Sequence, residues 1–210
     1  MGEISPQLAD NEAWVDQTFE KCDDILHRQV YLGQGRQEGL LVYVEVAVSN
    51  LMLEEHVIGL SDVQPLKSYA EGKAALLAGN GLLFLDGDTN CYKISSKGYP
   101  GLGVKKAENE KVIRGSQEAF TESEKINVAL IRKRLRDSRM KVEEQTVGVR
   151  SHTMTALVYM EDLIYQGLLT TMKQQLQRYE IDGILDSGML EQLSEKHWLS
   201  PFPQFQTTER

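Results

Sequence analysis

The pentapeptide LVYVE occupies residues 41–45, and LVYME occupies residues 157–161, 116 positions further along the chain. Both read as core strands, since they join aromatic and β-branched residues. Gly33 and Gly148 end the strand-like runs that precede them at nearly the same offset. We interpret the pattern Leu-Val-Tyr-x-Glu as a sign of two similar α/β lobes. The alternative is that a common core-strand composition coincides by chance.

Local signals in the first half predict a helix, a hairpin, a second helix and a second hairpin. The first helix rests on helical spacing of apolar residues, with Asp10 or Asn11 as its cap; these residues are Val15, Phe19, Cys22 and Leu26. The first hairpin joins RQVYLG to EGLLVYVEVAV, and a short helix is expected over 51–60. The pattern Ser68-x-x-Glu71 is a capping box for a helix that Gly79 ends, and Asp86-Gly87 marks the second hairpin.

The order helix, hairpin, helix recurs in the second half. A helix is expected over 118–136, two strands in KVEEQTVG and HTMTALVYM, and another helix over 163–179. A short strand and a helix should follow. The predicted fold class is therefore α/β, with two small similar lobes, each a mixed sheet flanked by helices. The expected divisions are a lobe at 1–96, a linker at 97–112, a lobe at 113–198 and an extended arm at 199–210.

Composition and charge exclude several classes of protein. With 210 residues and 41% apolar residues the chain can bury a core, and it has no apolar run near the roughly 20 residues of a membrane span. Cys22 and Cys91 lack a CxxC spacing and are expected to be buried, reduced thiols. The net charge of −8 falls in the first 97 residues, so nucleic acid is not an expected partner.

Catalytic and metal-binding motifs are not found, so we predict no enzyme activity, no metal and no cofactor. GQGRQEG joins two strands and is interpreted as a turn, not a phosphate-binding loop. DGDTN, from Asp86, opens like a calcium loop, but Lys97 stands where a bidentate Glu is needed.

Two sets of residues are candidates for a binding or interface site. The first set is a candidate interface or anion contact, and most of it lies in the basic run from Lys125 to Lys141. That run is expected either to contact an anion or acidic neighbour or to be a solvated helix face. The set comprises Arg114, Asn127, Arg132, Arg134 and Arg136. The second is a candidate cleft between the lobes, where strand ends carry polar groups; it comprises Tyr43, Glu45, Tyr159, Glu161 and Asp162. Glu161 and Asp162 are alternatively helix-capping acids.

The second half resembles the soluble N-terminal domain of GerA-family spore germination proteins, either receptor A subunits or the spoVAF-like branch. The resemblance rests on four blocks in order: VIRGSQEAFTESEKINVALIRKRLRD, VGVRSHTMTALVYMED, IDGILDSG and SPFPQFQTTER. Against the family pattern RGPREGF, this chain has RGSQEAF from Arg114 to Phe120 and lacks the proline, the arginine and the second glycine. The family's N-x-x-L-I-R-x-R is kept from Asn127 to Arg134.

The resemblance implies a role in nutrient-triggered germination, by ligand sensing, signal transmission or subunit assembly coupled to ion release. The implied partners are other germination-receptor subunits, the protein's own transmembrane domain and a small nutrient germinant. The implied location is the inner spore membrane, with this soluble domain on the cytoplasmic, core side. The alternative function is a free-standing two-lobed module that binds small solutes in a cleft, with lobes that move about the linker.

Overall fold

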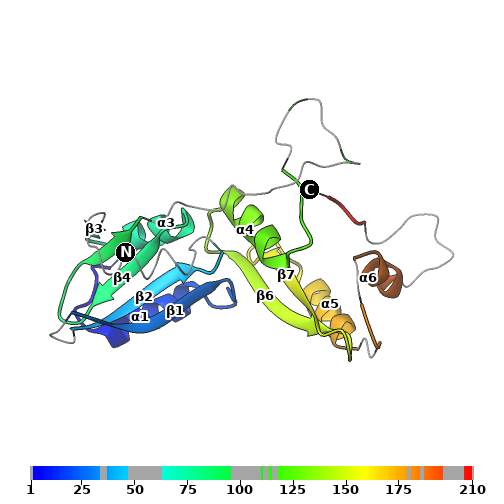
Figure 1. The fold of residues 1–210 in the computed structure, drawn as a ribbon, viewed down its shortest axis with the longest axis horizontal. Coiled ribbons are helices and arrows are strands. Elements are labelled where there is room, and N and C mark those ends of the chain that lie inside the picture. The colour runs from blue at the N-terminus through cyan, green and yellow to red at the C-terminus, as the bar shows by residue number, and fades with distance from the viewer. Residues whose placement is uncertain are drawn as a thin grey trace.

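The computed structural model describes residues 2–33, 37–46, 63–95, 110, 114, 118–178, 181–184, 187–195 and 206–209. These residues form two lobes that lie side by side along the long axis of the molecule (Figure 1). In spatial order, the five-stranded sheet of the first lobe consists of β1 (Ile25–Leu32), β2 (Gln37–Val44), β4 (Gly81–Leu85), β5 (Cys91–Ile94) and β3 (Val63–Leu66). The second lobe holds a two-stranded sheet of β6 (Met140–Val147) and β7 (Thr153–Met160). The predicted α/β class is confirmed, with sheets that are antiparallel rather than mixed.

The core of the first lobe lies between its sheet and two helices, α1 (Leu8–Thr18) and α3 (Tyr69–Leu77). Both helices pack against β2 and β4. Trp14 of α1 stacks on the ring of Tyr69 at a centroid distance of 4.5 Å, and the Tyr69 hydroxyl donates a 2.7 Å hydrogen bond to Asn11. Strand β2, paired with β1 on one side and β4 on the other, is largely buried beneath these helices.

The first helix is shorter than predicted. It ends at Thr18, and no side-chain hydrogen bond caps its first turn, which follows Gln7. Lys21 has a φ of +58°, a left-handed conformation that no helix continues, and Leu26 belongs to β1. The prediction of one helix over the apolar residues from Val15 to Leu26 was therefore wrong at its end, because residues from Ile25 onward pair with β2 over eight residues and form β1.

The capping box and both hairpins of the first lobe are confirmed. The Ser68 hydroxyl accepts a 3.3 Å hydrogen bond from the Glu71 N–H, and the Glu71 carboxylate accepts one from Lys67 N–H at 2.9 Å. Gly79, with φ +89°, follows the end of α3. The DGDTN segment is a turn between β4 and β5, in which Asp88 accepts hydrogen bonds from Asn90.

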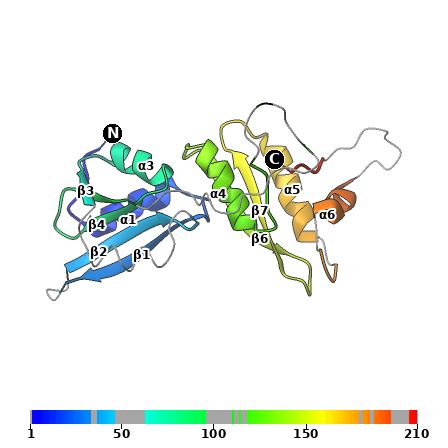
Figure 2. The same ribbon diagram turned by 45° about the horizontal axis from the view of Figure 1, so that its top comes forward.

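In the second lobe, helices cover both faces of the β6–β7 hairpin. Helix α4 (Glu124–Arg134) is shorter than the predicted 118–136 and packs on one face, where Val128 contacts Met140 and Val142. Helix α5 (Gln166–Arg178) lies on the other side (Figure 2). Its Lys173 reaches Glu143 of β6 there.

The chain after α5 returns to the turn of the β6–β7 hairpin. Residues 181–184 do not form the predicted strand; their carbonyl groups instead accept hydrogen bonds from the β6–β7 turn, including 2.8 Å from Val149 N–H to Ile181 O. Helix α6 (Ser187–Ser194) follows. The predicted helix at 51–60, the linker at 97–112 apart from Glu110, and most of the arm at 199–210 lie outside the described residues.

The repeated pentapeptide has the same structural place in both lobes. Each copy begins in the second strand of a hairpin that follows a helix, and its glutamate comes directly after the strand. Gly33 and Gly148 occupy the hairpin turns with φ values of +66° and +83°. The two copies lie in separate sheets of five and of two strands, so the lobes share the order of helix and hairpin but differ in the size of the sheet. In β7 the predicted face of Val158 and Met160 packs towards α4.

Candidate functional site: the joint between the lobes

The lobes meet at a joint made of residues 21–24 of the first lobe, the outer edge of β6 and helix α4. The Val142 N–H donates to Lys21 O and the Asp23 N–H donates to Val142 O, both at 2.9 Å. This parallel bridge extends the β6–β7 sheet by one short segment of the other lobe. The Asp23 side chain accepts a further 2.7 Å hydrogen bond from Glu144 N–H. Strand β6 is thus paired on both edges over this stretch.

A buried ion pair lies at the centre of the joint. Arg132 of α4 donates two hydrogen bonds to the Asp24 carboxylate, Nη2 to Oδ1 at 2.7 Å and Nε to Oδ2 at 2.9 Å. The exposed fractions of the two residues are 0% and 3%. Burial alone would lower the pKa of Arg132, but the hydrogen bonds and charge of Asp24 outweigh it and raise that pKa. The guanidinium and the carboxylate thus meet in a bidentate geometry that satisfies both groups.

Backbone groups complete the surroundings of Arg132. Its Nη1 donates to the carbonyl oxygens of Asp137, at 3.3 Å, and Met140, at 3.2 Å. The Cys22 thiol donates to the same Met140 oxygen at 3.5 Å, and burial raises the thiol pKa. Cys22 and Cys91 are both free and buried, as predicted.

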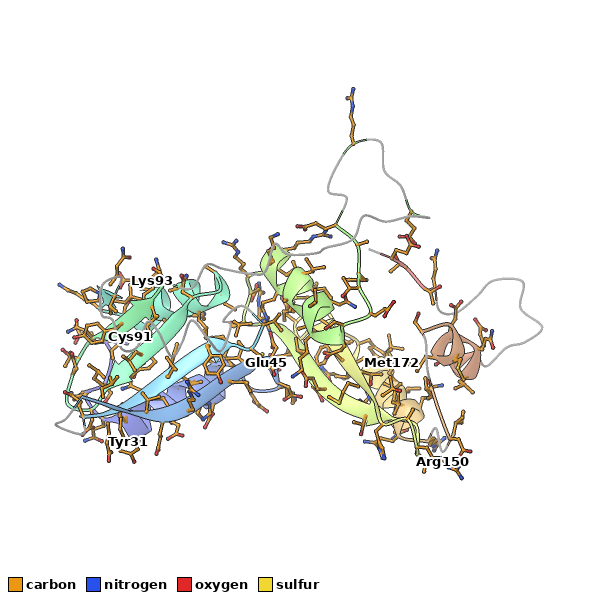
Figure 3. All side chains as sticks on the ribbon, in the orientation of Figure 1. Tyr31, Glu45, Cys91, Lys93, Arg150 and Met172 are labelled. Carbon is orange, nitrogen blue, oxygen red and sulfur yellow. The ribbon has the colours of Figure 1, made fainter. Side chains whose placement is uncertain are left out.

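Carboxylates line the rim of the joint. Glu45, at the end of the first lobe's β2, pairs with Lys125 of α4, and its N–H donates to Asp24 O at 2.9 Å. Figure 3 labels Glu45 where the two lobes meet. Burial, and then the charge of Glu144, raises the pKa of Glu124. Within the described residues, no group of three or more histidine, cysteine, aspartate or glutamate side chains is arranged to hold a metal ion.

The structure distributes the predicted basic residues among different contacts. Arg132 alone of the named set is buried in the joint. Arg134 lies 3.5 Å from Glu118, Arg136 donates to a backbone carbonyl of α4, and Arg114 is exposed. Asn127 accepts a 2.7 Å hydrogen bond from Thr121 N–H and so shapes the entry to α4.

The five residues of the candidate cleft do not share one groove. Tyr43 packs against the core of the first lobe, and Glu45 lies on the α4 side of the second sheet. The Tyr159 hydroxyl instead donates to Glu143 at 2.5 Å, on the side of α5. Burial, and then this hydrogen bond, raises the pKa of Tyr159. The two-residue alternation of β7 is the reason, because it sends Tyr159 to the face opposite α4.

The remaining two cleft residues form local ion pairs at the open end of the β6–β7 hairpin. Glu161 lies 3.4 Å from the buried Lys141, and Asp162 lies 2.6 Å from Arg139. Neither caps α5, which begins only at Gln166.

Sequence reasoning missed Asp24, the partner of Arg132. The acidic bias of the first lobe indicated that α4 had an acidic neighbour, but Asp24 is one of many acids there. Its place three residues after the left-handed Lys21, and 108 residues from Arg132, carries no local signal.

Comparison with known proteins identifies the family. Residues 51–210 match the family described as "Bacillus/Clostridium GerA spore germination protein", and the chain belongs to this family. It is 30% identical to the uncharacterized membrane protein YfkQ and 28% identical to spore germination protein KA, both of Bacillus subtilis, over 99% of its length. It spans 44% and 42% of those two relatives, somewhat less than half of each.

A solved structure has the same fold. The N-terminal domain of the A subunit of the Bacillus megaterium spore germinant receptor GerK3 matches with a TM-score of 0.73 and 21% identity, over 100% of this chain and 86% of that one. The described helices of this chain include none that is long and apolar enough to cross a bilayer.

Proposed function

We propose that this chain is the N-terminal signal-transmitting region of a spore germination membrane protein, acting in nutrient-triggered germination coupled to ion release. The role is non-enzymatic. Its partners are other germination-receptor subunits, the remainder of its own polypeptide in the inner spore membrane and a small nutrient germinant, with this region on the core side. Support comes from the family and from relatives named as spore germination proteins, which are about twice as long as this chain.

The observation that carries the proposal is the buried Arg132–Asp24 pair. It fastens α4 to the first lobe, so a force on either lobe reaches the other through a charged contact that water does not screen. The entry to α4 is also tied to the C-terminal segment, since Phe120 N–H donates to Glu209 O at 2.7 Å. A continuous route therefore runs from the first lobe through α4 to residue 209.

Germination of spores that carry the full-length protein tests this role. Arg132→Ala should slow nutrient-triggered germination at least about tenfold, because one buried charge loses its partner. The exchange Asp24→Arg with Arg132→Asp should restore part of the rate, whereas Arg136→Ala, a surface change, should leave it unchanged. An Arg132→Ala protein that accumulates normally and supports the wild-type rate would contradict signal transmission through the joint.

A further inference from the structure

A cavity of about 290 Å³ lies away from the joint, between α5, α6 and residues 206–208. Its size is near the lower end, about 300 Å³, of pockets that hold small molecules. Figure 3 labels Met172, which lines it from α5. The third wall is the C-terminal segment, so the cavity exists only while that segment lies against the two helices.

The lining combines an aliphatic floor with one charge. Met172 and Leu176 are one turn apart on the same face of α5, and Leu190 adds to this floor from α6. Among the lining residues that the structure describes, Glu191 is the only charged one. Among the described residues no lysine, arginine or histidine pairs with its carboxylate. The other described residues of the lining carry hydroxyl or amide side chains.

We propose that this cavity binds a small aliphatic ammonium compound. Its ammonium group pairs with Glu191, and its hydrocarbon part lies on Met172, Leu176 and Leu190. An anion is disfavoured by the Glu191 charge, and a neutral hydrocarbon leaves that charge without a partner.

Occupancy would join α5 and α6 to the C-terminal segment. Thr208 of that segment donates to Glu110 at 2.8 Å, so a bound ligand stabilises a wall that already contacts another part of the chain. The binding site does not rest on the signalling role proposed above, because it is defined by the cavity alone.

The 210-residue chain labelled with ¹³C in its methionine methyl groups provides the test. Titration with 3-methylbutylammonium chloride should shift the Met172 methyl resonance saturably, and leave Met140, buried between β6 and α4, in place. The Met172 resonance is assigned as the one lost in Met172→Leu. Sodium chloride at equal ionic strength serves as the blank.

Variants and a neutral ligand test the role of the charge. Glu191→Gln should weaken binding at least about tenfold, since a charge-assisted contact is lost, while Glu195→Gln, one turn away, should keep the wild-type affinity. The uncharged 3-methylbutan-1-ol has a similar shape and should bind to the unmodified chain at least about tenfold more weakly than the amine. This comparison tests the role of the charge even if the Glu191→Gln variant does not fold. The absence of a saturable Met172 shift, or equal affinity for amine and alcohol, would overturn the proposal.

Discussion

At the scale of single residues, Arg132 shows how one side chain joins two lobes. Its guanidinium donates to both Asp24 oxygens and to the carbonyl groups of Asp137 and Met140, so four of its five N–H groups have partners within the protein. Because a buried charge without a partner is strongly unfavourable, each member of the pair depends on the other.

Removal of one partner should therefore be costly for stability. Arg132→Ala is expected to lower the free energy of unfolding by about 3–5 kcal/mol, measured by urea denaturation. Asp24→Leu combined with Arg132→Leu should lose much less, because no unpaired charge remains. Arg136→Ala is the surface control, with a change within about 0.5 kcal/mol. An equal loss for the single and the double variant would show that packing, not charge, explains the effect.

Glu124 should make stability depend on pH in an unusual direction. Its Oε1 is buried and has no hydrogen-bond partner within the described part of the chain, and burial raises the pKa of Glu124. A raised carboxyl pKa means that the folded state holds the proton more tightly, so this group favours folding at low pH and opposes it as pH rises through the folded pKa.

Glu124→Gln is accordingly expected to stabilise the chain at pH 7, by no more than about 1 kcal/mol, since the residue is partly exposed. The gain should disappear near pH 4, where glutamate is largely protonated in both states. Urea denaturation of both proteins at several pH values measures the difference. Destabilisation by the variant at pH 7 would contradict this assignment.

At the scale of secondary structure, two helices that each follow a serine differ in how their first turn is capped. Ser68 precedes α3 and its side chain accepts from Glu71 N–H, whereas Ser123 precedes α4 and makes no side-chain cap hydrogen bond. At the start of α4 the polar groups of Thr121 and Asn127 bond to each other instead.

This difference predicts unequal effects of the same substitution. Ser68→Ala should lower the free energy of unfolding by about 1 kcal/mol through loss of the cap. Ser123→Ala should change it by a few tenths of a kcal/mol, roughly the effect of an ordinary surface substitution. Thermal unfolding followed by circular dichroism compares the two. Equal losses would mean that the hydroxyl of Ser123 has a capping role.

At the scale of the whole molecule, the joint opposes free movement of the lobes. The expected motion about residues 97–112 requires the lobes to separate, yet a backbone bridge to Val142 and the Arg132–Asp24 pair cross between them. We therefore expect the two lobes to keep one relative placement.

Small-angle X-ray scattering measures this rigidity. The curve of the unmodified chain should fit one relative placement of the lobes both at low salt and at 1 M salt, because the ion pair is buried and poorly screened. Arg132→Ala should require a broader distribution of placements, and Arg136→Ala should not. A salt-dependent distribution in the unmodified chain would restore the mobile arrangement.

Several elements could be predicted because their signals are local. The Ser68–Glu71 cap, the Asp86-Gly87 turn and the alternation that places Val158 towards a helix depend on residues a few positions apart. Other predictions failed where distant pairing competed with local pattern. Leu26 had helical spacing, but pairing with β2 placed it in a strand.

The sequence by itself determined the α/β class, both first-lobe hairpins, the helix and hairpin order of each half and the family, since strand alternation, turn residues and motif order all depend on short segments. Only the tertiary structure decided that Arg132 pairs with Asp24 and that Tyr159 and Glu45 lie on different faces. Those facts depend on how two separately formed sheets meet, 108 residues apart in the case of the ion pair. Many acids of the first lobe could satisfy an arginine, and the fold brings one of them to it.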